Sequence, residues 1–291
     1  MNSKLDLRPL DASFGAIVNG VDLKTVGDHL FNEIYQLWLD HSLLIFPKQT
    51  MRGSDQVQFA KRFGELEFDI KSVSNINKDG SVRSDTKNDD VLKILQGNMS
   101  WHADSSYLPV LSKGAVFSAK VVPSSGGETS WADMRSAYDA LDSDTKHNIS
   151  NLAAYHSLYY SQSKLGHNHS SRSDYNGYGF FDQDPPLRPL VYSHPETQRK
   201  ILTLGRHAYG VPGMKENESE AFLAELLEFA CQPPRVYQHN WQVGDVAVWD
   251  NRSLLHQARP WDMTEPRIMY QSRIAGDEKS DFAPSPKQGA A

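Results

Sequence analysis

The chain has a single cysteine, Cys231, in 291 residues, so it cannot form an internal disulfide. One thiol also excludes a cysteine cluster, and any metal must therefore use histidine and carboxylate ligands. Scarcity of cysteine is typical of proteins from a reducing compartment, and we expect a cytoplasmic protein. The first residues contain no apolar segment of the kind found in secretory signals.

Two other absences restrict the possible partners. No stretch approaches the roughly 20 consecutive apolar residues that cross a membrane. The formal net charge is -6 and the basic residues are scattered, which leaves no Lys/Arg patch to bind a phosphate backbone. We therefore expect no nucleic acid and no membrane as partner, but a small-molecule substrate. We also expect a homo-oligomer, a dimer or larger.

The composition that remains is that of a globular chain, with 39% hydrophobic and 23% charged residues. Many short apolar runs separated by turn residues predict strands, and there is no internal repeat or β-α-β alternation. Helices are expected near residues 30–38, 54–63, 133–141 and 218–229, with Ser54 and Asp133 as caps. The pattern predicts a mainly β protein, a sandwich or jelly roll with flanking helices.

We interpret residues 1–291 as one catalytic domain. The segment 161–186 is rich in Ser, His, Asn, Gly, Asp and Pro, and a loop of that length is typical of an active-site lid. The polar segment 277–291 is expected to be a mobile tail.

The motif Trp101-His102-Ala103-Asp104 and the distant His256 are candidate metal ligands. On a strand, the side chains of residues i and i+2 point to the same face, so His102 and Asp104 could bind one ion. Two histidines and one carboxylate leave coordination positions open, as a non-haem Fe(II) centre requires. A lone His-x-Asp also occurs by chance, and a structural histidine is then the ordinary explanation.

The last predicted strand, residues 267–275, places two arginines on one face. By strand alternation this face carries Arg267, Met269, Gln271 and Arg273. It is either a solvent-exposed polar surface or an inward face that binds carboxylates. A guanidinium can hold a carboxylate through two parallel hydrogen bonds. Because the candidate metal ligand His256 precedes this strand, we favour the inward, carboxylate-binding face.

Taken together, these motifs resemble the Fe(II)/2-oxoglutarate-dependent dioxygenases of the taurine/2,4-dichlorophenoxyacetate family. That family has a His-x-Asp, a Thr or Ser about two dozen residues later, a distal His, and an Arg about eleven residues beyond it. Here Thr129 follows Asp104 by 25 residues and Arg267 follows His256 by 11. The Gly-Gly-Glu-Thr turn at 126–129 and the segments 194–200 and 244–252 are also similar, so the likeness covers residues 6–277 or so.

The resemblance implies a double-stranded β-helix, a jelly roll, with Fe(II) at one end. His102, Asp104 and His256 would ligate the iron, and Arg267 with the Thr129 hydroxyl would hold the distal carboxylate of 2-oxoglutarate. O₂ would be the second cosubstrate, and ascorbate would support the reaction in vitro. The implied activity is hydroxylation of a substrate, coupled to conversion of 2-oxoglutarate into succinate and CO₂.

The expected substrate contacts come from positions where this chain departs from the taurine-type members. Those members have a second arginine four residues after the first, where this chain has Gln271. Arg273 could replace that contact, assist 2-oxoglutarate, or pair with Asp104 or Glu128. Asn98 matches a substrate-side position of the family.

Two further segments, 157–161 and 205–209, resemble the aryloxyalkanoate (phenoxypropionate-type) branch, which makes His207 and Tyr209 candidate substrate contacts. The leading hypothesis is therefore a small organic acid with an aromatic or apolar body, with possible cleavage of its ether bond. The same chemistry on an amino acid or secondary metabolite, by hydroxylation or desaturation, or on a taurine or alkylsulfonate substrate, is the alternative. A non-catalytic jelly-roll binding protein is disfavoured, because the complete ligand set is present together with Thr129 and Arg267.

Overall fold

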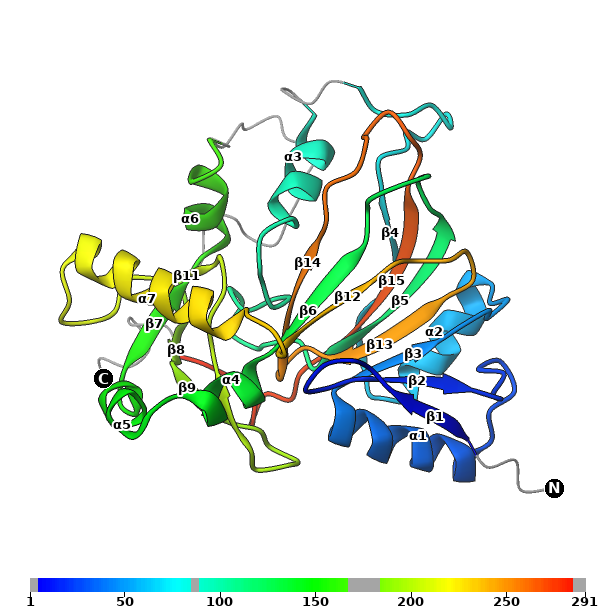
Figure 1. Ribbon diagram of the computed structural model, residues 1–291. Helices are drawn as coiled ribbons and strands as arrows, with labels where there is room; N and C mark the ends of the chain where they lie inside the picture. Colours follow the sequence, from blue (N-terminus) through cyan, green and yellow to red (C-terminus); the bar gives the residue numbers. More distant parts are fainter. Residues whose placement is uncertain (1–4, 85–88, 167–183, 285–291) are drawn as a thin grey trace.

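A computed structural model describes residues 5–84, 89–166 and 184–284 of the chain (Figure 1). Its largest element is a seven-stranded sheet with the strand order β1-β2-β3-β13-β5-β15-β4. Neighbouring strands in it are antiparallel, except for the parallel pair β2 and β3. The strands are β1 (Asp6–Pro9), β2 (Ala16–Asn19), β3 (Leu43–Phe46), β4 (Leu66–Ser74), β5 (Gly114–Val121), β13 (Val246–Asp250) and β15 (Ile268–Ile274).

A second, three-stranded sheet has the order β12-β6-β14 and is antiparallel throughout. Its strands are β6 (Thr129–Asp133), β12 (Val236–His239) and β14 (Leu254–Ala258). An apolar cluster joins the two sheets, in which Phe117, Trp249 and Met269 of the large sheet pack with Trp131 and Leu254 of the small one. Two antiparallel sheets over a shared apolar layer form the framework of a jelly roll.

The other face of the large sheet is covered by two helices, α1 (Asp28–His41) and α2 (Gly53–Lys61) (Figure 1). Strands β3 and β13 are therefore buried along their whole length, which explains their nearly continuous apolar sequences. Arg52, not the predicted Ser54, is the N-cap of α2, because the Asp55 carboxylate accepts a hydrogen bond from Arg52 N at 2.9 Å.

Most of the remaining elements contribute to a third apolar cluster beside the sandwich. Two small sheets contain β7 (Ala153–His156), β8 (Leu187–Pro189), β9 (Val191–Ser193), β10 (Lys200–Leu202) and β11 (Ala208–Tyr209). The helices of this part are α3 (Asp90–Gly97), α4 (Met134–Ala140), α5 (Ser143–Ile149), α6 (Leu158–Ser163) and α7 (Glu216–Ala230). Asp133 caps α4 as predicted, since its side chain accepts a hydrogen bond from Arg135 N at 3.0 Å.

Two segments were expected to be loops, the lid at residues 161–186 and the mobile tail at residues 277–291. Residues 161–163 are the end of helix α6, and residues 167–183 of the predicted lid lie outside the described residues. The first part of the expected mobile tail is held in place. Leu187 N donates a hydrogen bond to Pro284 O at 2.9 Å, and the Tyr192 hydroxyl donates one to the buried Asp281 carboxylate at 2.9 Å.

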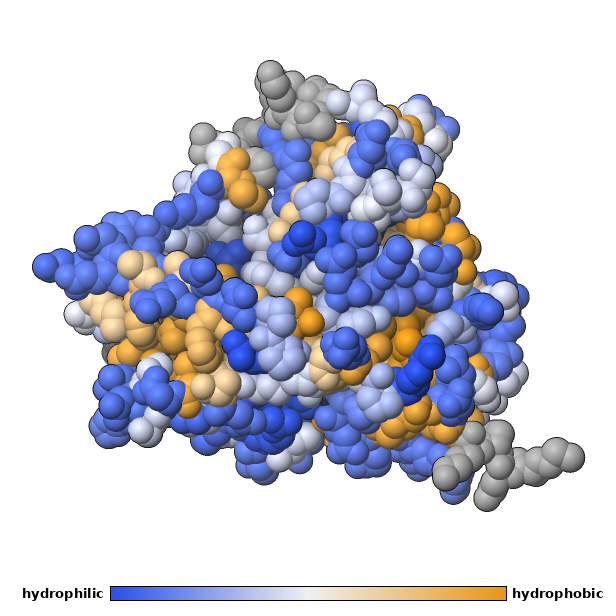
Figure 2. Space-filling model, in the orientation of Figure 1, coloured by the Kyte–Doolittle hydropathy of each residue, from blue (hydrophilic) through white to orange (hydrophobic). Residues whose placement is uncertain are grey.

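The surface is mostly polar on the face drawn in Figure 2, where apolar residues show in several separate areas. The large hydrophobic side chains that are most exposed include Tyr159, Leu165, Phe229, Val243 and Phe282. Among the described residues, no helix combines the length and the apolar character needed to cross a membrane.

Candidate metal centre and cavity

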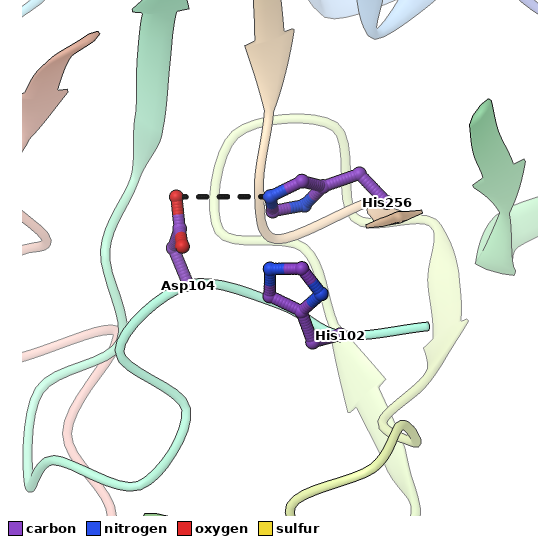
Figure 3. A group of neighbouring side chains, drawn as sticks. All are labelled: His102, Asp104 and His256. Carbon is purple, nitrogen blue, oxygen red and sulfur yellow. Dashed lines mark ion pairs between the residues drawn. The ribbon is translucent and has the colours of Figure 1, made fainter. Parts of the chain in front are cut away.

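The three predicted ligands converge on one point inside the protein (Figure 3). His102, Asp104 and His256 are all buried, and their ligand atoms lie within 4.8 Å of one another. His256 Nε2 is 3.9 Å from Asp104 Oδ2, and the two imidazole centroids are 4.2 Å apart. Among the described residues, this is the group of histidine and carboxylate side chains placed to hold a metal ion.

Backbone contacts fix the positions of these side chains. His102 and His256 form an isolated antiparallel bridge. Asn251, just after β13, holds the backbone of Asp104 through two hydrogen bonds. Its Oδ1 accepts one from Asp104 N at 2.8 Å, and its Nδ2 donates one to Asp104 O at 2.9 Å. The prediction that His102 and Asp104 lie on one strand is wrong in detail, since the pairing ends at the bridge and Asp104 begins a turn. Ser105, the next residue, has a φ of 58°.

The electrostatics suit a cationic ligand. Burial lowers the pKa of His102 and of His256, so both rings are neutral and each can offer a lone pair. His102 Nδ1 donates to Ser100 O at 2.8 Å, which leaves Nε2 for a metal. Burial alone would raise the pKa of Asp104, but the charge of Arg273, with a hydrogen bond from Gln271, outweighs burial and the net shift is downward. Two neutral imidazoles and a carboxylate are a donor set that fits Fe(II).

The triad opens into a cavity of about 460 Å³. Arg267 lines it, buried, with its Nε donating to Gly127 O at 3.1 Å and its guanidinium 5.2 Å from the centre of the Trp261 ring. Burial lowers the pKa of Arg267 to about 10, against an opposing effect of Glu128, so the side chain stays charged at neutral pH. Thr129 also lines the cavity, and its Oγ1 accepts a hydrogen bond from Trp241 Nε1 at 3.0 Å.

Of the other predicted contacts, Asn98, Gln271, Arg273 and His207 line the same cavity. Arg273 is engaged with the carboxylate of the triad: its Nη2 is 3.0 Å from Asp104 Oδ1. Tyr209 is not among the lining residues. Its ring instead stacks on Tyr160, with centroids 4.6 Å apart, so the cavity gives no support to the predicted substrate contact.

Two cationic side chains of the cavity were not singled out in the sequence, Lys71 on β4 and Arg206 before β11. Arg206 precedes the predicted His207, which was the available signal. Lys71 is an exposed residue of the edge strand β4, most of which is half-buried, and no sequence pattern around it indicates a site. Apolar residues also line the cavity, namely Val91, Ile94 and Leu95 of α3 and Leu158 of α6.

Comparison with known proteins decides the family. Residues 6–272 match the family described as Taurine catabolism dioxygenase TauD, TfdA family. The chain belongs to this family. It is 56% identical to a protein from Sphingobium herbicidovorans named (S)-phenoxypropionate/alpha-ketoglutarate-dioxygenase, over 97% of this chain and 99% of the relative. A protein of the same name from Delftia acidovorans is 52% identical over 97% of this chain and 99% of the relative.

A more distant relative and a solved structure are also similar to the chain over most of its length. An alpha-ketoglutarate-dependent 2,4-dichlorophenoxyacetate dioxygenase from Cupriavidus pinatubonensis is 35% identical over 92% of this chain and 97% of the relative. The crystal structure of AAD-2 in complex with Mn(II) and N-oxalylglycine superposes with a TM-score of 0.86 at 36% identity, over 94% of this chain and 97% of that one. The predicted jelly roll and the predicted enzyme class, an Fe(II)- and 2-oxoglutarate-dependent dioxygenase, are confirmed.

Proposed function

We propose that this TauD/TfdA-family dioxygenase hydroxylates small aryloxyalkanoic acids on the carbon next to the ether oxygen. The proposal rests mainly on one cavity, which is lined by the metal triad, by four cationic side chains that include Lys71 and Arg206, and by apolar residues. The relatives at 56% and 52% identity, whose names specify (S)-phenoxypropionate, support the same substrate class.

The shape and chemistry of the cavity suit such an acid. A volume of about 460 Å³ falls within the range of small-molecule sites. Val91, Ile94 and Leu158 offer an apolar surface to an aromatic ring, while Lys71 and Arg206 offer positive charge to a carboxylate. We assign the substrate carboxylate to Lys71 and Arg206, which line the cavity together with these apolar side chains.

In this proposal His102, Asp104 and His256 hold the Fe(II). When bound, the iron supplies the O₂ activation that couples decarboxylation of 2-oxoglutarate to oxidation of the substrate. The protein's part is to orient the ligands. The hydrogen bond from His102 Nδ1 to Ser100 O fixes the tautomer and the ring plane. The two hydrogen bonds between Asn251 and the Asp104 backbone fix the carboxylate-bearing turn.

The distal carboxylate of 2-oxoglutarate is assigned to Arg267 and Thr129. The Arg267 guanidinium lies over the Trp261 ring and its Nε donates a hydrogen bond to Gly127 O, so we assign the carboxylate to its two Nη groups. Thr129 Oγ1 already accepts a hydrogen bond from Trp241 Nε1, which leaves the hydroxyl proton to be donated to the same carboxylate.

The overall reaction balances as substrate C–H, O₂ and 2-oxoglutarate giving substrate C–OH, succinate and CO₂. Hydroxylation of a carbon that bears an ether oxygen gives a hemiacetal or hemiketal. That product collapses to a phenol and an aldehyde or keto acid, so ether cleavage follows without a further catalytic group.

The test is succinate formation from 2-oxoglutarate with Fe(II) and ascorbate, alone and with each of a panel of acids. The panel contains phenoxyacetate, both enantiomers of 2-phenoxypropionate, taurine, an alkyl sulfate and an amino acid. We expect stimulation by an aryloxyalkanoate together with an equal amount of phenol. Stimulation by another class only, or succinate without phenol, would overturn the assigned substrate.

A further inference from the structure

Both oxygens of the Asp104 carboxylate are held, and by different groups. Oδ1 lies 3.0 Å from Arg273 Nη2. Oδ2 accepts a hydrogen bond from Gln271 Nε2 at 2.8 Å, and it is also the oxygen that faces His256 Nε2, at 3.9 Å (Figure 3). The structure thus distinguishes the two oxygens: Oδ2 faces His256, and Oδ1 faces Arg273.

The arginine that holds Oδ1 is itself fixed. Arg273 is buried, its Nη1 donates to Ser105 Oγ at 3.2 Å, and its Nη2 donates to Gln271 Oε1 at 3.4 Å. Its Nη1 lies 3.6 Å from Glu67 Oε2, and its guanidinium is 5.0 Å from the centre of the Phe68 ring. Both Nη groups are therefore committed to protein atoms. A side chain so engaged has little to offer an incoming carboxylate.

The same group of contacts supports the backbone behind the ligand. Ser105 has a φ of 58°, in the left-handed region, directly after Asp104. That conformation is unfavourable for a non-glycine residue and persists only where neighbours hold it. Here the Ser105 hydroxyl donates to Glu67 Oε2 at 3.1 Å and accepts from Arg273. Glu67 in turn accepts a hydrogen bond from Ser112.

We propose that Arg273, with Gln271, positions Asp104 so that it offers the metal one oxygen, Oδ2, and keeps Oδ1 away from it. A carboxylate can bind a metal through one oxygen or through both, and the second mode takes an additional coordination position. A site that must also accept a keto acid and O₂ needs that position. Arg273 is then a positioning residue for the metal ligand, and not an anchor for substrate or cosubstrate. This inference rests on the ligand set assigned under the proposed function.

The test measures binding of Mn(II) to the metal-free protein by calorimetry, without 2-oxoglutarate or substrate. Loss of a group that orients a metal ligand typically weakens metal binding 10–100-fold, and we expect that loss for Arg273→Met. The matched control is Arg62→Met, which breaks the 2.6 Å ion pair between Asp28 of α1 and Arg62 at the end of α2, neither of which lines the cavity, and should bind Mn(II) as the wild type does. The absorption of bound Co(II) reports the coordination number, and we expect it to change in Arg273→Met as Oδ1 is released.

Thermal unfolding of each variant separates misfolding from loss of positioning. If Arg273→Met does not fold, Arg273→Lys and Gln271→Met decide the question, because each removes part of the hold on Asp104; both should weaken Mn(II) binding. Wild-type affinity and an unchanged Co(II) spectrum in the folded variants would overturn the inference while leaving the triad intact. Failure of the wild type to bind Mn(II) would instead contradict the ligand assignment itself.

Discussion

His102 and His256 are joined by two backbone hydrogen bonds: His102 N donates to His256 O at 3.0 Å, and His256 N donates to His102 O at 2.8 Å. Directly opposed residues of an antiparallel pair have neighbouring side chains on the same face. The pairing therefore brings together two imidazoles from distant parts of the sequence, 4.2 Å between centroids. The distance between the proposed ligands is set by the backbone.

This bridge makes His102→Ala a specific test of the ligand assignment. Alanine keeps both backbone hydrogen bonds, so the fold should persist while one of three ligands is lost. We expect the variant to lose stoichiometric Fe(II) binding, as measured by metal analysis after anaerobic loading, with an unchanged circular dichroism spectrum. A folded variant that still retains one iron per chain would show that His102 is not a ligand.

Arg267→Ala should weaken 2-oxoglutarate binding by about 2–5 kcal/mol, the usual effect of truncating one member of a buried charge pair. Calorimetric titration of the Mn(II)-loaded protein gives the affinity. Arg267→Lys is the control that keeps the charge but loses the paired donors, and it should bind with intermediate affinity. If Arg267→Ala binds 2-oxoglutarate normally, the distal carboxylate lies elsewhere, with Lys71 and Arg206 the next cations to test.

Thr129→Val tests the hydroxyl proton that Trp241 leaves available. Valine keeps the size and branching of the side chain but cannot donate. Because a hydrogen bond to a charged group contributes about 1.5–3 kcal/mol, 2-oxoglutarate binding should weaken by that amount. Thr129→Ser should restore most of the affinity. Equal affinities in the valine and serine variants would remove Thr129 from the cosubstrate site.

His156, which lies outside the proposed site, should make the free energy of unfolding depend on pH in the acid range. Its ring is completely buried, and neither ring nitrogen has a hydrogen-bond partner. Burial, with a smaller effect of Arg188, lowers the pKa of His156 from 6.5 to about 3. As the pH falls below 6.5, His156 becomes protonated in the unfolded chain but stays neutral in the folded protein. The free energy of unfolding therefore decreases until the pH approaches 3.

His156→Leu removes this titration without leaving a polar group unpaired. Between pH 7.5 and pH 5 the wild type should lose about 2 kcal/mol more stability than the variant does, from the proton taken up by the unfolded histidine. Urea unfolding of both proteins at the two pH values measures the difference. The same loss in both proteins would mean that His156 is not the group responsible.

Much of the site followed from spacing in the sequence. Strand alternation over residues 267–275 predicted that Arg267, Gln271 and Arg273 share a face, and all three line the cavity. Strand alternation depends only on residues that are neighbours in the chain, so it can be recognised in the sequence. The alternation also left three roles open for Arg273, and the 3.0 Å contact with Asp104 corresponds to one of them.

The rest depended on tertiary structure. The local His-x-Asp spacing indicated a strand through Asp104, but the Asn251 amide and the Arg273 guanidinium, distant in sequence, hold a turn there instead. Lys71 and Arg206 come from separate elements and share no pattern. Only the packing of β4 and of the segment before β11 around the cavity brings them to its wall. For Tyr209 the sequence pattern was misleading in the opposite way. His207, two residues earlier, lines the cavity, but the Tyr209 ring stacks on Tyr160.

The most direct test of the central claim is an anaerobic titration of 2-oxoglutarate into the Fe(II)-loaded protein, followed by visible absorption. A keto acid that chelates Fe(II) gives a charge-transfer band, and we expect this band to increase until one 2-oxoglutarate is bound per chain. It should be absent in His102→Ala and require much higher 2-oxoglutarate in Arg267→Ala. A wild-type protein that holds Fe(II) but shows no band at saturating 2-oxoglutarate would contradict the account.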